Sequence, residues 1–290
     1  MTQPADNKPA ATFRIPRPLR KLCLGATFVF AGVLLVLSFL ENKLVYPIPP
    51  IHAADWAPAF PLEEAAFQAA DGTELHGWLL ESHPDAPWVL YCHGNGDQVA
   101  NSGAWLSQLR DKLPANIFVF DYRGYGKSAG SPTEAGVLSD GEAALDWICQ
   151  RSGCRPERII LMGRSLGGAV AVHLASEHGA AGLVLERTFT RLTDAAKARF
   201  WWAPVNWLMR NRYHSIEKIP RYDGPLLSSH GTRDDVVPYH LGVELFSAAG
   251  APDSLKTFVE LPNVGHNGPN TEEYLQTLFQ FIRDHGVAAR

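Results

Sequence analysis

Hydrophobic and polar positions follow two different periods along residues 62–290. Short apolar runs typical of buried strands fall near 64–70, 75–82, 87–92, 117–121, 158–162, 182–186, 225–229 and 256–261. Segments with helical spacing fall near 98–112, 134–150, 166–178, 238–249 and 271–285. Because strands and helices alternate from about residue 87 onward, we expect an α/β fold, with a mostly parallel eight-stranded sheet covered by helices on both faces. The first two strands, joined through Asp71-Gly72, are expected to form an antiparallel hairpin at one edge.

The longest apolar stretch is residues 22–40, which carry no charge and are bounded by Lys21 and Glu41. As a helix this stretch would span about 28 Å, close to the bilayer hydrocarbon core of about 30 Å. A cleaved signal peptide is the alternative, but its apolar region is usually about 7–15 residues long and ends before small residues. Because residues 37–43 offer no such cleavage site, the pattern favours an uncleaved signal-anchor that forms a single transmembrane helix.

Basic residues are distributed unevenly around this stretch. Those before it are Lys8, Arg14, Arg17, Arg20 and Lys21. Between Lys43 and Arg110 there is no lysine or arginine. The positive-inside rule therefore predicts a cytoplasmic N-terminus and a larger domain on the non-cytoplasmic side, which is the periplasm in a bacterium.

We accordingly expect four parts: a cytoplasmic tail at 1–21, a transmembrane anchor at 22–40, a Pro-rich linker at 41–61 and an α/β domain at 62–290. The last part is long enough to bury a large core as one domain. A net charge of −4 and the absence of a basic run in the soluble part argue against a nucleic-acid partner.

A candidate nucleophile lies in the sequence Gly-Arg-Ser-Leu-Gly at 163–167. This G-x-S-x-G pattern follows an apolar run and opens an Ala- and Val-rich segment, so the local order is strand, sharp turn, helix. Glycines suit such a turn because they let the strand and the helix approach closely. We therefore expect Ser165 to hold its hydroxyl above the sheet.

A serine hydroxyl becomes nucleophilic when a histidine accepts its proton and a carboxylate orients that histidine. Candidates for the carboxylate are Asp234 and Asp235, which follow the predicted strand 225–229. The candidate base is His266, which follows the predicted strand 256–261. Ligands meet open α/β sheets at the carboxyl ends of the strands, so we expect these side chains near Ser165.

Together, five motifs resemble those of the α/β-hydrolase superfamily. They are 91–96 (Tyr-Cys-His-Gly-Asn-Gly), 121–128 (Asp-Tyr-Arg-Gly-Tyr-Gly-Lys-Ser), 163–168, 230–238 and 265–266. More closely, the chain resembles the Bem46-like, ABHD-type branch of membrane-anchored serine hydrolases over about residues 62–286.

The resemblance implies Ser165 as nucleophile, His266 as base and Asp234 as acid, with Asp235 as the alternative acid. It also implies an oxyanion hole formed by the backbone N–H groups of Leu166 and Asn95. His93 and His230 are interpreted as structural residues beside the site.

No cofactor or metal is expected. The Gly-Lys-Ser at 126–128 does not belong to a P-loop, because Asp121 stands where that motif requires glycine. The histidines and cysteines show no metal-ligand spacing. A disulfide between Cys149 and Cys154 is left open, since it requires the chain to turn between them.

A short cap is expected at about 187–224, where the chain is too long for a simple connection. It contains the aromatic residues Phe200, Trp201, Trp202, Trp207 and Tyr213. Three interpretations of these side chains stay open: packing within the cap, lining of an apolar pocket, and contact with a membrane interface.

The resemblance implies hydrolysis of carboxylic esters or thioesters through an acyl-enzyme, with small-molecule, lipid or acylated substrates. One alternative is an aminopeptidase- or amidase-type hydrolase, which would need carboxylates in the cap, where basic residues outnumber acidic ones. Another is a noncatalytic membrane-tethered binding module, which loss of the nucleophile, acid or base would favour. All three residue types are present.

Overall fold

The computed structural model describes residues 16–52, 56, 58 and 60–286. The chain divides into two compact units, residues 1–41 and residues 42–290.

Helix α1, Arg17–Val45, contains the predicted anchor at 22–40. An 18-residue window of α1 has a mean hydropathy of 2.4 and is not buried, so the helix is long and apolar enough for a membrane span or a signal sequence. The predicted tail at 1–21 falls largely outside the described residues, and its final part is helical because α1 begins at Arg17. Leucine, arginine and lysine there all favour helix.

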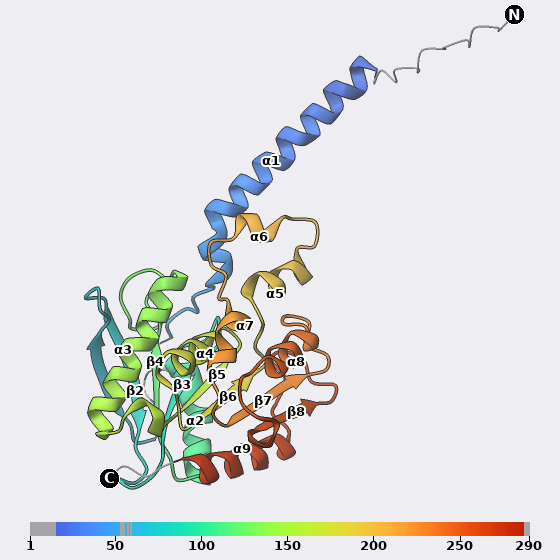
Figure 1. Cartoon of the computed structure of the whole chain (residues 1–290). Coiled ribbons are helices and arrows are strands. Elements are labelled where there is room, and N and C mark those ends of the chain that lie inside the picture. Colours follow the sequence, from blue (N-terminus) through green and yellow to red (C-terminus); the bar gives the residue numbers. More distant parts are fainter. Residues whose placement is uncertain (1–15, 53–55, 57, 59, 287–290) are drawn as a thin grey trace, which may run out of the picture. The chain divides into compact units, whose positions relative to one another are not determined.

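The second unit is built on an eight-stranded sheet with the order β1-β2-β4-β3-β5-β6-β7-β8 (Figure 1). The strands are β1 Glu63–Gln68, β2 Glu74–Leu80, β3 Trp88–Cys92, β4 Asn116–Asp121, β5 Ile159–Arg164, β6 Gly182–Glu186, β7 Leu226–Gly231 and β8 Lys256–Leu261. The longer helices are α2 Val99–Lys112, α3 Glu134–Ser152, α4 Leu166–His178, α8 Tyr239–Ser247 and α9 Glu272–His285. Short 3-10 turns occur at Pro156–Arg158, Ile219–Arg221 and Asp253–Leu255. The predicted α/β fold is confirmed.

The sheet is parallel from β4 to β8 in its spatial order, and β1 and β2 form its antiparallel edge. The edge hairpin turns at Gly72, whose φ of 81° suits a residue without a Cβ atom. The predicted hairpin is therefore correct.

Two hydrophobic cores cover the two faces of the sheet. Successive strand residues point to opposite faces, so Leu90 and Phe118 lie in one core while Val89 and Ile117 lie in the other. The first core includes apolar residues of α3, α4 and α8, and the second includes those of α2 and α9. These two layers hold the central strands rigidly, and the strand ends carry the candidate site.

Between β6 and β7 the chain forms the cap region with three short helices, α5 Leu192–Arg199, α6 Val205–Leu208 and α7 Ser215–Lys218.

Helix α3 ends just before Gly153, which adopts a φ of 69°. The chain does turn between Cys149 and Cys154, but both are free thiols in the structure.

Candidate active site

Ser165 occupies the sharp turn between β5 and α4, with φ 52° and ψ −116°. A non-glycine residue in this region of backbone space costs about 1–3 kcal/mol and persists only when its surroundings enforce it. Here the Ser165 N–H donates to the Glu186 carbonyl at 2.8 Å. The Ser165 carbonyl accepts from the Thr188 hydroxyl at 2.8 Å and from Gly168 N at 3.0 Å. These bonds hold the turn.

The two glycines flanking Ser165 are required by close approach. A Cβ atom on Gly167 would overlap the carbonyl of Cys92 at the end of β3. A Cβ atom on Gly163 would overlap the backbone of Gly167 in the first turn of α4. Strand, turn and helix can therefore pack this tightly only with glycine at both positions.

His266 lies in the loop after β8 and connects Ser165 to Asp234. Its Nε2 is 3.1 Å from the Ser165 Oγ, and its Nδ1 is 2.7 Å from the Asp234 Oδ2. A carboxylate only accepts, so Nδ1 carries the proton and Nε2 is free to accept from the serine hydroxyl. All three residues are nearly buried, with exposures of 8% for Ser165, 8% for Asp234 and 9% for His266.

The Asp234 carboxylate is held from both sides. Its Oδ1 accepts from Val236 N at 2.9 Å and Val237 N at 2.7 Å. Burial alone would raise its pKa, but hydrogen bonds from His230, His266 and the Val237 N–H hold the pKa well below its usual range. Asp234 therefore stays ionised beside His266. Asp235, the alternative acid, points to solvent and is exposed.

The other two histidines singled out from the sequence have structural contacts. His230 Nε2 donates to the Val237 carbonyl at 2.8 Å and lies 3.3 Å from Asp234 Oδ2. His93 bonds the Gly94 carbonyl through Nδ1 at 2.9 Å and packs on the Tyr122 ring, with 4.4 Å between centroids. Neither bonds Ser165, so the structure gives them supporting positions.

The predicted oxyanion donors lie on the two sides of Ser165. Leu166 is the first residue of α4, so its N–H is among the four that an α-helix leaves without an internal partner. Asn95 follows Gly94, and a Cβ atom built on Gly94 would lie 3.8 Å from Ser165 Cβ. The loop bearing Asn95 thus passes directly beside the candidate nucleophile.

Two arginines that the sequence analysis did not single out fix the His266 loop. Arg164 donates to the His266 carbonyl at 2.9 Å, and Arg187 donates to the same oxygen at 3.0 Å. Arg187 is 2% exposed, has a φ of 49°, and also bonds Asn270 Oδ1 at 2.9 Å. Burial lowers its pKa, which the neighbouring Glu186 opposes. These guanidinium groups position the backbone that carries the imidazole.

The Asn95 side chain connects its loop to the segment that leaves α1. Its Nδ2 donates to the Val45 carbonyl, and its Oδ1 accepts from the Tyr125 hydroxyl at 2.6 Å. Burial raises the pKa of Tyr125, so that hydroxyl keeps the proton it donates. Both polar ends of the Asn95 amide are therefore occupied, which orients the loop backbone.

Residues 42–50, which we call the strap, are part of the domain and not a spacer. Tyr46 is 2% exposed, and its hydroxyl lies 2.9 Å from Asn211 Oδ1 and 2.8 Å from the Tyr213 hydroxyl. Gln98 Nε2 donates to the Pro50 carbonyl at 3.5 Å. The prediction of a Pro-rich linker at 41–61 is thus wrong for the strap, because Asn42, Val45, Tyr46 and Pro50 all form hydrogen bonds with the domain. Residues 53–55, 57 and 59 of that linker lie outside the described residues.

The chain is similar to known proteins from several organisms. A family model described as the alpha/beta hydrolase fold matches residues 87–211. The chain is 36% identical over 249 residues to the Mycobacterium tuberculosis protein Rv2307c, covering 83% of this chain and 85% of the relative. It is 30% identical over 289 residues to the alpha/beta hydrolase domain-containing protein WAV2 of Arabidopsis thaliana, covering 90% and 93%.

Protein bem46 of Schizosaccharomyces pombe is 29% identical over 280 residues, covering 89% of this chain and 91% of the relative. Among solved structures, the Pyrococcus furiosus esterase Pf2001 is similar with a TM-score of 0.67 at 19% identity, covering 82% of this chain and 97% of that chain. At this identity the structural likeness concerns the fold.

The depressed pKa of Asp234 predicts how stability depends on pH. Because the folded pKa lies below the ordinary value of about 3.9, the unfolded chain binds more protons in that window, and folding loses stability as the pH falls below about 5. Replacing Asp234→Asn removes this contribution. We expect the melting temperature of the variant to fall less steeply with acid than that of the wild type.

The measurement is thermal unfolding of the full chain in detergent, followed from pH 7 to pH 3. Asp235→Asn is the matched control, because it makes the same change at the exposed neighbour and should leave the wild-type slope unchanged. Parallel curves for wild type and Asp234→Asn would show that the carboxylate is not specially stabilised.

Proposed function

The chain belongs to the α/β hydrolase family, with Bem46-like relatives, and from this premise we propose that it is a membrane-anchored serine hydrolase that cleaves carboxylic esters or thioesters. One observation carries the proposal: the continuous hydrogen-bonded chain from Ser165 through His266 to Asp234. A nucleophile, a base and an orienting carboxylate in this arrangement constitute the machinery of acyl transfer.

In the proposed reaction, His266 Nε2 takes the proton of the Ser165 hydroxyl while Oγ attacks the substrate carbonyl carbon. The tetrahedral intermediate collapses, the bond to the leaving alcohol or thiol breaks, and His266 returns the proton to that group. In the second half, His266 takes a proton from a water molecule, which attacks the acyl carbonyl. The bond to Ser165 Oγ then breaks, His266 returns the proton to Oγ, and the carboxylic acid is released. Asp234 stabilises the imidazolium that forms in both steps.

The negative charge that develops on the carbonyl oxygen needs donors that are in place beforehand. We assign this role to the backbone N–H groups of Leu166 and Asn95, from the two sides of Ser165. The amino end of α4 adds the favourable end of the helix dipole. Neither donor has to move far, because the glycine contacts hold α4 against β3.

The contacts in the cap support ester and thioester substrates over peptides with a free amino end. Recognition of an α-ammonium group needs an available carboxylate. In the described cap, Asp194 accepts from Thr190 at 2.8 Å, and Glu217 pairs with Arg191 at 3.0 Å and His214 at 3.0 Å. Two of the three carboxylates of the cap are thus engaged, the third being Asp223, and basic residues outnumber acidic ones there, which disfavours the aminopeptidase alternative. The complete hydrogen-bonded chain likewise disfavours a noncatalytic binding module.

We propose that α1 anchors the enzyme in the membrane with the catalytic domain on the non-cytoplasmic side. Support comes from the length and hydropathy of α1 and from the basic residues that precede its apolar part. An uncleaved anchor would keep the active site close to the bilayer, where esters and thioesters of long acyl chains reside.

The proposal is tested by labelling the full chain in detergent with a fluorophosphonate probe, which reacts with activated serines. We expect rapid labelling of the wild type and loss of at least about 10⁴-fold in labelling rate for Ser165→Ala and for His266→Ala. Ser229→Ala, at a buried serine on β7, is the control for loss of a hydroxyl. Equal labelling of wild type and Ser165→Ala would refute the assignment of the nucleophile.

The contact between Asn95 and the strap predicts a further effect on the reaction rate. Asn95→Ala keeps the backbone N–H but removes the bonds to Val45 and Tyr125, so the oxyanion donor loses its orientation. We expect kcat for p-nitrophenyl butyrate to fall roughly 10- to 100-fold with little change in KM. Asn101→Ala, at an exposed position on α2, should retain the wild-type kcat. An unchanged kcat in Asn95→Ala would mean that the strap does not support the oxyanion hole.

The proposed orientation is testable with a membrane-impermeant thiol reagent on sealed cells. A single cysteine at the exposed Asp253, introduced as Asp253→Cys in a chain lacking its other cysteines, should react from the non-cytoplasmic side. A cysteine at Thr2 should react only after the membrane is opened. The reverse pattern would place the active site in the cytoplasm.

A further inference from the structure

The cap presents a set of large aromatic side chains to solvent. Trp201 is 81% exposed and Trp207 is 90% exposed, while Trp202 and Phe200 are 42% and 36% exposed. Large apolar side chains exposed together in one short segment are unusual in a soluble domain and mark a contact with a partner or a membrane. For Trp201 and Trp207, packing within the described part of the cap does not account for their position.

The charged residues of this segment are all basic. Exposed basic residues of the same segment are Lys197, Arg199, Arg210 and Arg212. Residues 197–213 contain no aspartate or glutamate. Tryptophan favours the headgroup level of a bilayer, and each lysine or arginine near an anionic leaflet contributes about 1 kcal/mol. We call residues 197–213 the cap surface.

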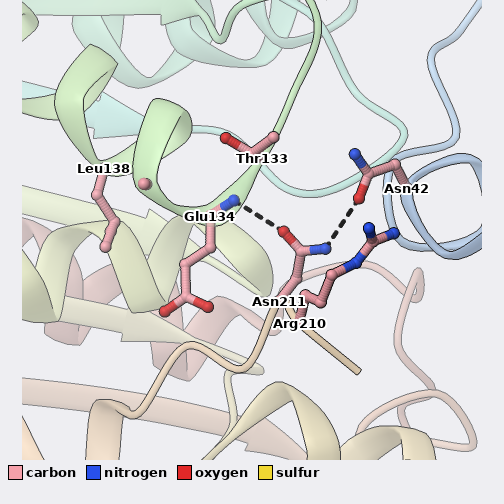
Figure 2. A pocket seen from close by; sticks show the side chains of 7 residues that line it. Asn42, Thr133, Glu134, Leu138, Arg210 and Asn211 are labelled. Carbon is pink, nitrogen blue, oxygen red and sulfur yellow. Dashed lines mark hydrogen bonds between the residues drawn. The ribbon is translucent and has the colours of Figure 1, made fainter. Parts of the chain in front are cut away.

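The cap surface is fastened to the strap, one residue beyond the end of the first unit. Asn211 Nδ2 donates to Asn42 Oδ1 at 3.0 Å, and Asn211 Oδ1 accepts from the Glu134 N–H at 2.8 Å (Figure 2). Asn211 is 4% exposed, and beside it lies a hollow of about 420 Å³ lined in part by Asn42, Glu134 and Arg210. Tyr46 and Tyr213 add a second connection at 2.8 Å.

This connection limits how far the cap surface can lie from the bilayer. Asn42 is two residues beyond the apolar stretch 22–40, and a residue spans at most about 3.6 Å of chain. Whatever direction α1 takes, Asn211 therefore stays within about 10–15 Å of the last apolar residue of the proposed anchor. The headgroup region on each side of the bilayer is about 5–8 Å deep, so this distance keeps Asn211 at or just above the membrane surface.

We infer that the cap surface rests on the bilayer, with Trp201 and Trp207 among the headgroups and its basic residues on anionic lipid phosphates. The inference rests on the proposed anchoring by α1 and adds a second membrane contact to it. Two contacts would fix the height and tilt of the catalytic domain. The cap would then face the interface, so that the active site takes its esters or thioesters from membrane lipids or lipidated proteins at that surface.

The test places the full chain in nanodiscs that contain phosphatidylglycerol and lipids brominated near the headgroup, and measures quenching of tryptophan fluorescence. We expect marked quenching in the wild type, and loss of at least about half of the quenched signal in the double variant Trp201→Phe, Trp207→Phe. Trp105→Phe, at a partly buried position on α2, is the matched control and should leave the quenched signal unchanged. Replacing Arg199→Ala and Arg210→Ala should weaken quenching in anionic nanodiscs more than in zwitterionic ones.

Quenching that is equal in the wild type and the double tryptophan variant would overturn the inference. So would a dimer in nanodiscs whose Trp201 and Trp207 are shielded from brominated lipid, because a second copy would then cover the cap surface. Failure of the full chain to enter nanodiscs would overturn the proposed anchoring and this contact together. Fluorophosphonate labelling of the same samples tests the catalytic proposal separately. Because the probe is soluble and does not have to come from the membrane, it should label the double variant at the wild-type rate.

Discussion

The backbone conformation of Ser165 is the constraint on which the rest of the site depends. A residue with φ 52° and ψ −116° is strained, and only close contacts on every side keep it there. These contacts come from three neighbouring strands: the Cys92 carbonyl of β3 faces Gly167, β5 leads into the turn, and the Glu186 carbonyl of β6 accepts from Ser165 N. The parallel order β3-β5-β6 at the centre of the sheet is therefore what makes the turn possible.

The partner residues meet Ser165 because their own loops are equally constrained. The Asp234 loop closes on itself through the N–H groups of Val236 and Val237. The His266 loop is fixed by two arginines that share its carbonyl. Arg187 itself has a positive φ, so strain is stored on both sides of the imidazole. The hydrogen bonds from Ser165 to His266 and from His266 to Asp234 are each about 3 Å long. They need this rigidity, since a displacement of about 1 Å can cost 10²-fold in rate.

Much of this arrangement could be predicted from local sequence. Apolar periodicity located all eight strands, and strand ends pointed to Ser165, Asp234 and His266 as neighbours. Local patterns could not rank Asp234 over Asp235 without the family resemblance, because the choice depends on a turn that directs one carboxylate inward. Arg187 gave no signal, since its partners lie about 80 residues further along the chain. Local sequence predicts a linker at the strap because its proline content is typical of linkers, whereas Tyr46 is buried by partners 165 and 167 residues away.

The central claim is that Ser165 forms a covalent acyl intermediate. The most direct measurement is rapid acid quenching of the wild type during turnover of p-nitrophenyl butyrate, followed by peptide mass spectrometry. The account predicts one butyryl group on the peptide that contains Ser165, present during turnover and absent once the substrate is consumed. Turnover without an adduct on Ser165, or an adduct elsewhere that persists in Ser165→Ala, would contradict it.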